Sequence, residues 1–220
     1  MRAMLLHKGS IMDILMLRIE PNLTWEELEG YLGCVSRARR AAIARKKCES
    51  DKINSLLSRL LVLSEISRRT GLAQRKIKFT YGTNGKPYLK GGGLEFSVSH
   101  TDGAICAAFS ENGEIGIDVE RRDRRVSEGL YKRVLSEEEQ FHLTSNLDFL
   151  RFWVQKEAFL KRLGIGITRD LRGINSLELP DTAVIDCGDF FVGASGKGAP
   201  DSTVREITVS ELLSRFVKLV

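Results

Sequence analysis

Residues 95–120, EFSVSHTDGAICAAFSENGEIGIDVE, decide the fold class. Polar and apolar residues alternate in 95–100, and 104–110 and 115–120 have the β-branched and apolar composition of two further strands. The linker 111–114 contains an Asn-Gly pair, which is typical of tight turns between antiparallel strands. The pattern therefore predicts consecutive strands, the last two of them joined as a β-hairpin.

Outside this stretch the hydrophobic period changes to that of helices and back again. Before the central strands we predict a strand at 11–19, a short helix starting at the capping box of Thr24 and Glu27, and a basic helix at 36–48. A helix that Asp51 caps and that ends before Gly71 follows, and then strands at 77–81 and 87–89. After the central strands we predict a helix at the capping box of Ser136 and Glu139, a helix at 148–163 ended by Gly164, strands after residue 171 and a short helix near Ser210. We expect an α+β protein of two similar-sized halves, 1–105 and 106–220, that meet near residues 103–113.

Composition excludes several classes of protein. The chain has 220 residues, 42% hydrophobic and 29% charged, which is ordinary for a globular domain. No run of about 18 apolar residues is present, so we expect no membrane span. The N-terminal stretch lacks a cleavage site, and the four cysteines form no CxxC pair, so we expect reduced thiols and a cytoplasmic location. The net charge of +5 favours anionic partners.

The segment GIDVE, residues 116–120, is a candidate metal site. Alternate residues of a strand share a face, so Asp118 and Glu120 point the same way, and Gly116 on that face leaves room for a ligand. Paired carboxylates repel unless a cation lies between them, and Mg²⁺ prefers such oxygen ligands; Mn²⁺ suits them too. The alternative is a solvated acidic strand edge beside Arg121 and Arg122.

The segment WVQKEAFLK, residues 153–161, is a second candidate. Trp153, Glu157 and Lys161 are four apart and share one helix face. Glu157 is a candidate third metal ligand or general base, and Lys156 and Lys161 are candidate phosphate contacts. The alternative is an ordinary surface Glu–Lys pair, which contributes only about 0.2–0.5 kcal/mol to helix stability.

Two loops carry further candidates for anion binding. A strand that ends in Ser99 and His100 presents a hydroxyl and an imidazole, and the turn that contains Lys86 and Pro87 offers a cation to a phosphate. Neither loop has the GxxxxGK[ST] pattern of a nucleotide-binding P-loop. The alternatives are a plain strand end and a plain hairpin turn.

Together, GKPYL (85–89), FSVSH (96–100), GIDVE (116–120) and WVQKEAFLKRLGIGI (153–167) resemble the 4′-phosphopantetheinyl transferase superfamily in its longer, Sfp-type form. The resemblance implies a monomeric pseudo-dimer of two α/β halves with the active site in the cleft between them. It implies transfer of the phosphopantetheine arm of coenzyme A to a serine of an acyl or peptidyl carrier protein, with Mg²⁺ required and adenosine 3′,5′-bisphosphate released. The implied partners are coenzyme A and an acidic carrier protein, with neither nucleic acid nor membrane.

The resemblance also implies roles for residues by position. It implies that Asp118, Glu120 and Glu157 bind the metal and that Glu157 is also a candidate base. Lys161 matches the lysine that contacts the coenzyme A diphosphate, and Lys156 matches the lysine just before the glutamate. Lys86 and Pro87 match the loop that borders the adenine and its ribose phosphate, and Ser99 and His100 match the Ser-His pair that holds coenzyme A phosphates. The family often has an arginine for the 3′-phosphate where Asn54 stands here. Candidates to replace it are Lys52, Arg40 and Lys47.

Two other functions fit parts of the sequence. Basic runs at 37–47 and 121–125 suit a non-catalytic domain that binds nucleic acid or a phosphorylated partner, although no zinc-finger or RRM signature is present. That hypothesis gives no reason for the three carboxylates. A Mg²⁺-dependent phosphohydrolase would use the carboxylates but would consume coenzyme A or a nucleotide without a carrier protein.

Overall fold

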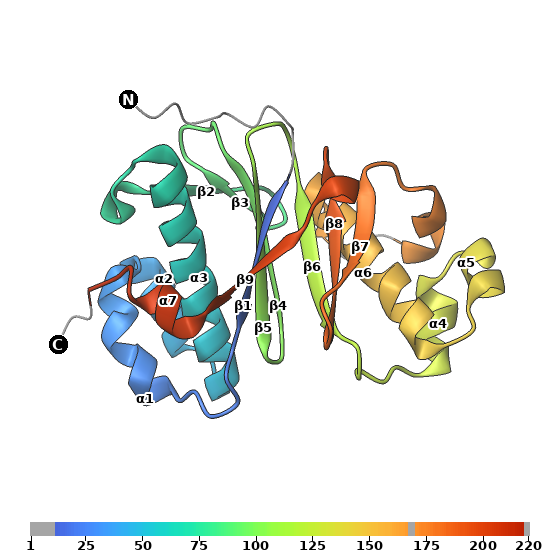
Figure 1. Cartoon of the computed structure of the whole chain (residues 1–220), viewed down its shortest axis with the longest axis horizontal. Coiled ribbons are helices and arrows are strands. Elements are labelled where there is room, and N and C mark those ends of the chain that lie inside the picture. Colours follow the sequence, from blue (N-terminus) through green and yellow to red (C-terminus); the bar gives the residue numbers. More distant parts are fainter. Residues whose placement is uncertain (1–11, 167–169, 218–220) are drawn as a thin grey trace.

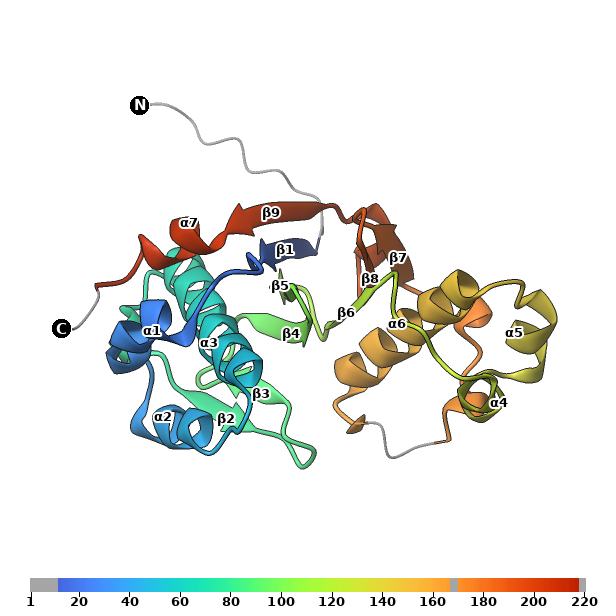
Figure 2. The same ribbon diagram turned by 90° about the horizontal axis from the view of Figure 1, so that it is seen from below.

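Two β-sheets lie side by side in the middle of the protein, and helices cover the outer face of each (Figures 1 and 2). The computed structural model describes residues 12–166 and 170–217. The first sheet has the strand order β4-β5-β1-β9 and the second β6-β8-β7. The strands of the first sheet are β4 (Glu95–Thr101), β5 (Ala104–Ser110), β1 (Asp13–Arg18) and β9 (Val204–Thr208); those of the second are β6 (Gly116–Arg121), β8 (Phe190–Ser195) and β7 (Thr182–Asp186). The predicted α+β class is confirmed.

Strand β1 shows why the layers form. Its side chains alternate between two faces. Ile14 and Met16 enter an apolar core between the two sheets, whereas Leu15 and Leu17 enter a second core against the helices of the first half. All four side chains are fully buried, which explains why this strand reads as a continuous apolar run rather than as an alternating one.

The helices of the first half lie on the outer face of the first sheet (Figure 1). They are α1 (Trp25–Leu28), α2 (Arg37–Ala44), α3 (Glu49–Thr70) and α7 (Val209–Leu213), with 3₁₀ turns at Glu29–Cys34 and Gln74–Lys76. Helix α3 begins two residues before the predicted cap, so Asp51 lies in its first turn. A negative charge there stabilises the helix by interacting with the positive end of its dipole. Gly71 ends it at φ 71°, as predicted.

The second half is helical between β6 and β7. It contains α4 (Glu128–Val134), α5 (Glu137–His142), α6 (Asn146–Leu163) and 3₁₀ turns at Leu171–Gly173 and Ser176–Glu178, and a third turn at Ala199–Asp201 precedes β9. The capping box of Ser136 and Glu139 and the left-handed Gly164 cap are confirmed. A small sheet of β2 (Phe79–Tyr81) and β3 (Pro87–Leu89) lies in the first half.

The predicted hairpin between the second and third central strands is wrong. Strand β5 pairs with β4 and β1, whereas β6 pairs with β8 in the other sheet. The hairpin lies one turn earlier, where the chain passes from β4 to β5 through Asp102 and Gly103. Five residues separate β5 from β6, and this longer connection crosses between sheets. Alternation identifies strands but does not say which of them pair.

The two halves are not contiguous along the chain. The predicted boundary at 105/106 falls inside β5, which belongs wholly to the first sheet. Strand β9, from the predicted second half, returns to pair in parallel with β1. The structure differs from the predicted division because the first sheet takes strands from both ends of the chain. The likeness of the two halves as a pseudo-dimer stays a prediction. Ile11, where the first predicted strand begins, and Ile167, where the fourth motif ends, lie outside the described residues.

Helix α6 packs directly on the second sheet through two glycines. A Cβ atom at Gly116 would lie 1.9 Å from the carbonyl oxygen of Ala158, and one at Gly193 would lie 2.1 Å from that of Val154. Only glycine permits this approach of helix backbone to strand backbone. The space that the sequence analysis left for a ligand at Gly116 is therefore filled by α6, which corrects that expectation.

We expect Gly116→Ala to destabilise the protein by about 1–3 kcal/mol, because the methyl group would push α6 off the sheet. Urea unfolding measures the change. The matched control is Gly173→Ala, since a Cβ atom there meets nothing within 4 Å. Equal stability of the two variants would mean that α6 is not held as closely as described.

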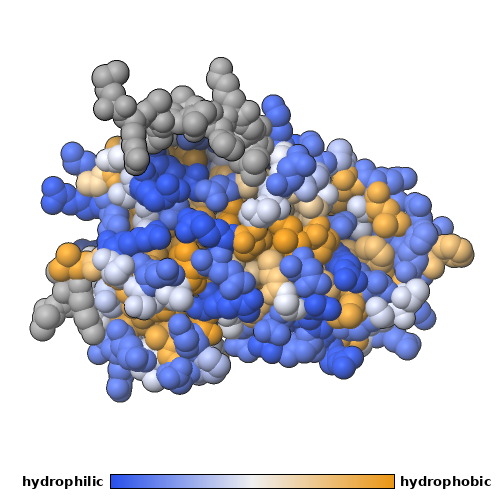
Figure 3. All heavy atoms as spheres, in the orientation of Figure 1, coloured by the Kyte–Doolittle hydropathy of each residue, from blue (hydrophilic) through white to orange (hydrophobic). Residues whose placement is uncertain are grey.

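None of the helices within residues 12–166 and 170–217 combines the length and the apolar character needed to cross a bilayer. Figure 3 shows the surface that faces the viewer in Figure 1. It is mainly hydrophilic, and apolar side chains gather near its middle.

Candidate active site

The candidate site lies where the edge strands of the two sheets meet. Hydroxyl groups on β4 bond to the neighbouring strand β6 at three successive alternate positions. The pairs are Ser97 Oγ accepting from the backbone N–H of Ile117 at 3.1 Å, Ser99 Oγ donating to Asp118 at 2.7 Å and Thr101 Oγ1 donating to Glu120 at 2.9 Å. Ser97, Ser99 and Thr101 alternate along β4, and Asp118 and Glu120 alternate along β6, so each set shares one face. The hydroxyls thus hold the two carboxylates at the seam, the line along which β4 meets β6.

Helix α6 brings the other charged groups to the seam. Glu157 and Lys161 lie one turn apart on the same helix face. The Lys161 ammonium donates to Asp118 Oδ1 at 2.6 Å and to Ser99 Oγ at 2.7 Å. The predicted sharing of a face is confirmed, and Lys161 contacts a carboxylate of the site.

Six of the predicted residues line one cleft of about 330 Å³. Its walls are Val98, Ser99, His100, Asp118, Val119, Glu120, Arg124, Trp153, Glu157 and Lys161. A second hollow of about 250 Å³ adjoins it through Val98, Glu157 and Lys161 and reaches Lys86 and Pro87. A third, of about 230 Å³, shares Pro87 and Val98 and extends to Arg39, Ser55 and Ser58. The three hollows share walls along one side of the seam.

Glu157 is the least satisfied carboxylate of the cleft. The residue is 5% exposed, and within the described residues its buried Oε1 has no hydrogen-bond partner. Burial, together with the neighbouring charge of Asp118, raises its pKa to about 7, against the opposing effect of Lys161 and Arg124. A carboxyl group with this pKa takes up or releases a proton near neutral pH, as a general base must.

His100 stands between the first and third hollows and lines both. Desolvation by the cleft walls, and then the charges of Lys161 and Lys46, lower the pKa of its imidazole. The ring is therefore biased towards its neutral form, in which one ring nitrogen donates a hydrogen bond and the other accepts one.

The three carboxylates fit a hard divalent cation by their chemistry. All three line the same cleft, and within the described part of the chain the buried Oε1 of Glu157 has no hydrogen-bond partner. In this structure Lys161 pairs with Asp118, and Arg124 pairs with Glu120. Among the described residues, no group of three His, Cys, Asp or Glu side chains is arranged so that it could hold a metal ion. A magnesium site therefore stays a prediction.

Lys86 lies in the cleft region, but its ammonium is already bonded. It donates to the carbonyl oxygens of Arg162 at 2.7 Å and Ile115 at 3.2 Å, and burial lowers its pKa. These bonds fix the β2–β3 loop against the end of α6. Pro87, the neighbouring predicted residue, lines two of the three hollows. Their contacts with coenzyme A stay predictions.

Lys156 does not face the cleft, which corrects its assignment as a phosphate contact. Its ammonium is fully buried and pairs with Glu139 at 2.5 Å. It also donates to the carbonyl oxygens of Val134 at 2.7 Å and Leu171 at 3.0 Å. Adjacent residues on a helix point about 100° apart, so Lys156 faces the second half's core when Glu157 faces the cleft.

Sequence reasoning missed several residues of the site. Arg39 donates to Ser55 at 3.3 Å and lines the third hollow with His100. Asn54 lines a separate hollow with Asp102 and Arg121. The proposed replacements Lys52, Arg40 and Lys47 line none of the three cleft hollows. The alternating hydroxyls at 97, 99 and 101 opposite Asp118 and Glu120 were a readable signal for the seam.

Fold and site together define an α+β protein with a cleft of carboxylates, lysine and histidine at the junction of two sheets. Two family profiles match the chain. One, described as 4′-phosphopantetheinyl transferase, N-terminal, matches residues 22–112, and one, described as the 4′-phosphopantetheinyl transferase superfamily, matches residues 114–188.

Curated relatives agree with the profiles. The 4′-phosphopantetheinyl transferase Sfp of Bacillus subtilis is 30% identical over 176 residues, which are 73% of this chain and 78% of that protein. The L-aminoadipate-semialdehyde dehydrogenase-phosphopantetheinyl transferase of Candida glabrata is 35% identical over 147 residues, 60% of this chain but only 56% of that protein. The chain belongs to the 4′-phosphopantetheinyl transferase superfamily. The resemblance to its Sfp-type members is confirmed.

Proposed function

We propose that the protein transfers the 4′-phosphopantetheine group of coenzyme A to a serine of an acyl or peptidyl carrier protein. The observation that carries the proposal is the convergence of Asp118, Glu120, Glu157 and Lys161 on one cleft at the seam of β4 and β6. Family membership supports the reaction class, because the relatives are named phosphopantetheinyl transferases.

The reaction exchanges a phosphoanhydride link for a phosphoester link. The carrier's serine oxygen forms a bond to the phosphorus next to the pantetheine, and the bond from that phosphorus to the bridging diphosphate oxygen breaks. Adenosine 3′,5′-bisphosphate leaves, and the serine proton passes to a base. Such transfers depend mainly on positioning and on stabilising charge at the phosphoryl oxygens.

Two side chains of α6 have properties that suit these needs. Lys161 lines the cleft, where its ammonium bonds to Asp118, and it would stabilise negative charge that develops on the diphosphate. Glu157, with its raised pKa and unpartnered oxygen, would accept the serine proton directly or through a water molecule. Bound by Asp118, Glu120 and Glu157, Mg²⁺ would neutralise the diphosphate.

The other two hollows suit the remainder of coenzyme A. Lys86 and Pro87 border one of them, and Arg39, Ser55 and His100 border the other. Arginine binds phosphate through paired donors. Arg39 would therefore hold the 3′-phosphate in place of the arginine that the family has at Asn54. The net charge of +5 would attract an acidic carrier protein.

The test is intact-protein mass spectrometry of an apo carrier protein incubated with the chain, coenzyme A and Mg²⁺. The proposal expects a mass gain of one phosphopantetheine and no gain with EDTA. Folded protein that binds coenzyme A yet modifies none of several unrelated acyl and peptidyl carriers would contradict transfer. Consumption of coenzyme A without any carrier would indicate a hydrolase instead.

We expect Arg39→Ala to raise the Kd for coenzyme A by about tenfold or more, because a hydrogen bond to a charged group contributes about 1.5–3 kcal/mol. The Kd for dephospho-coenzyme A, which lacks the 3′-phosphate, should stay unchanged. Arg40→Ala is the matched control, since Arg40 is exposed and lines none of the cleft hollows. Calorimetry measures both ligands; equal losses for both would place Arg39 elsewhere on coenzyme A.

A further inference from the structure

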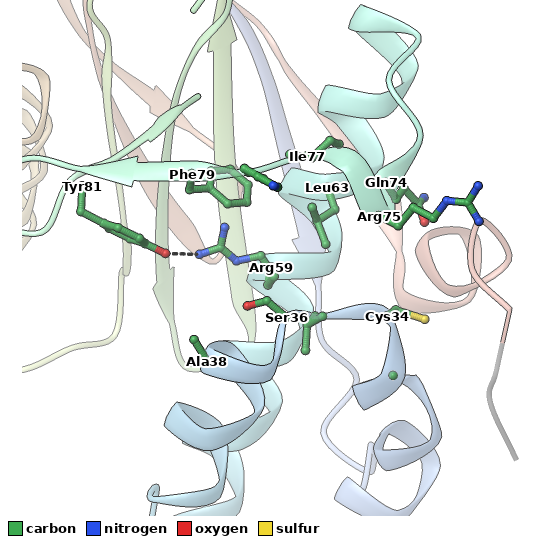
Figure 4. A pocket seen from close by; sticks show the side chains of 13 residues that line it. Cys34, Ser36, Ala38, Arg59, Leu63, Gln74, Arg75, Ile77, Phe79 and Tyr81 are labelled. Atoms are coloured by element: carbon green, nitrogen blue, oxygen red, sulfur yellow. Dashed lines mark hydrogen bonds between the residues drawn. The ribbon is translucent and has the colours of Figure 1, made fainter. Parts of the chain in front are cut away.

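A separate cavity of about 490 Å³ lies in the first half (Figure 4). Its lining comes from the turn before α2, the start of α2, the middle of α3 and the segment that leads into β2. The lining residues are Gly33, Cys34, Val35, Ser36, Ala38, Arg59, Leu63, Gln74, Arg75, Ile77, Lys78, Phe79 and Tyr81. None of the predicted site residues is among them, so the proposed reaction gives this cavity no role.

The charged end of Arg59 faces this cavity. Its Nη2 donates to the Tyr81 hydroxyl at 3.4 Å, and its guanidinium lies 4.1 Å from the centre of the Phe79 ring. Both rings line this cavity, and neither lines the coenzyme A hollow that Arg59 also borders. Figure 4 shows the guanidinium extending towards Tyr81.

Arg59 lacks the partner that a buried cation needs. The residue is 8% exposed, its Nη1 is buried without a hydrogen-bond partner, and among the described residues no carboxylate forms an ion pair with it. Burial, together with the charge of Arg39, lowers its pKa. Arg69 and Arg215, by contrast, are paired with the carboxylates of Asp13 and Glu65. An unpaired buried charge is costly, so the position suits an anion from outside the chain.

The rest of the lining determines what kind of anion fits. It contains no aspartate or glutamate, and it adds Lys78 and Arg75. Figure 4 shows Arg75 at the far side from Tyr81, with its guanidinium pointing away from Arg59. Apolar surface comes from Val35, Leu63, Ile77 and Phe79. Cavities of this volume accommodate small organic molecules.

We propose that this cavity binds a small organic anion with a flat apolar body, with the anionic group held by Arg59 and Lys78 and the body packed on Phe79 and Leu63. The proposal does not depend on the transferase activity. It makes the cavity a second ligand site that shares Arg59 as a wall with the third cleft hollow.

The probe is 2-naphthoate, and the uncharged 2-naphthamide is its matched control. Isothermal titration of the full chain should give saturable one-to-one binding of naphthoate and at least tenfold weaker binding of the amide. Cys34 lines the cavity, whereas the exposed Cys48 does not, so iodoacetamide labelling locates the site. Saturating naphthoate should slow labelling of Cys34 and leave that of Cys48 unchanged.

A pair of charge reversals completes the test. Lys78→Glu should weaken naphthoate binding by about fivefold or more, since it replaces attraction by repulsion. Lys76→Glu, an exposed neighbour outside the lining, should leave the affinity unchanged. Equal effects of the two reversals, equal affinity for acid and amide, or no saturable binding of naphthoate would each overturn the proposal.

Discussion

Glu157→Gln is expected to lower the rate of carrier modification by about 10²–10⁴-fold, the usual contribution of a positioned acid or base. The amide keeps the shape of the side chain but cannot accept the serine proton, and it is a weak ligand for Mg²⁺. The same change should leave the metal-free protein at least as stable as before. The reason is that it removes a buried carboxylate whose Oε1 has no partner among the described residues.

Both effects are measured on one preparation, the rate by mass spectrometry of the carrier protein and the stability by urea unfolding in EDTA. Glu137→Gln is the matched control, because Glu137 is exposed on α5 and outside the cleft. A variant that keeps more than a tenth of the rate would contradict the role of Glu157. A variant that is clearly less stable than the parent would contradict the account of its unpaired oxygen.

Lys156→Met is expected to destabilise the protein by about 3–5 kcal/mol, because it leaves Glu139 charged and buried without its partner. Glu139 is itself fully buried and accepts from the backbone N–H and the hydroxyl of Ser176 at 2.8 and 2.5 Å. One ion pair thus ties α6 to the start of α5 and to the turn that contains Ser176. A loss of this size is a large part of the stability of an ordinary domain.

Urea unfolding measures the change, and Lys197→Met, at an exposed position, should shift stability by no more than about 0.5 kcal/mol. Adding Glu139→Gln to Lys156→Met should restore part of the loss, because the unpaired charge is then gone. If Lys156 contacted a phosphate instead, Lys156→Met would raise KM for coenzyme A and leave stability unchanged.

Local signals in the sequence were reliable where one residue determines the geometry. The Gly71 and Gly164 caps and the Ser136 capping box depend on a few adjacent atoms, and each lies where it was predicted. The shared face of Glu157 and Lys161 follows from helix geometry alone. The carboxylates at 118 and 120 likewise share a face because strands alternate.

Other features depend on contacts between distant segments, and the sequence alone did not predict them. The partners of β5 and the return of β9 to β1 are long-range choices that a strand's own pattern does not encode. Gly116 was interpreted as space for a ligand because nothing in its neighbours shows that α6 approaches there. Lys156 was assigned to the site through its motif, although burial against Glu139 gives it a structural position.

The parallel pairing of β9 with β1 ties the end of the chain to its beginning. Without β9, the row of backbone donors and acceptors along β1 would become an open sheet edge, which is a template for association with other chains. The first half therefore cannot be excised as a contiguous piece that keeps all four of its strands. During synthesis, β1 therefore stays an open edge until residues 204–208 have emerged, and the pairing of β9 then protects that edge against association with other chains.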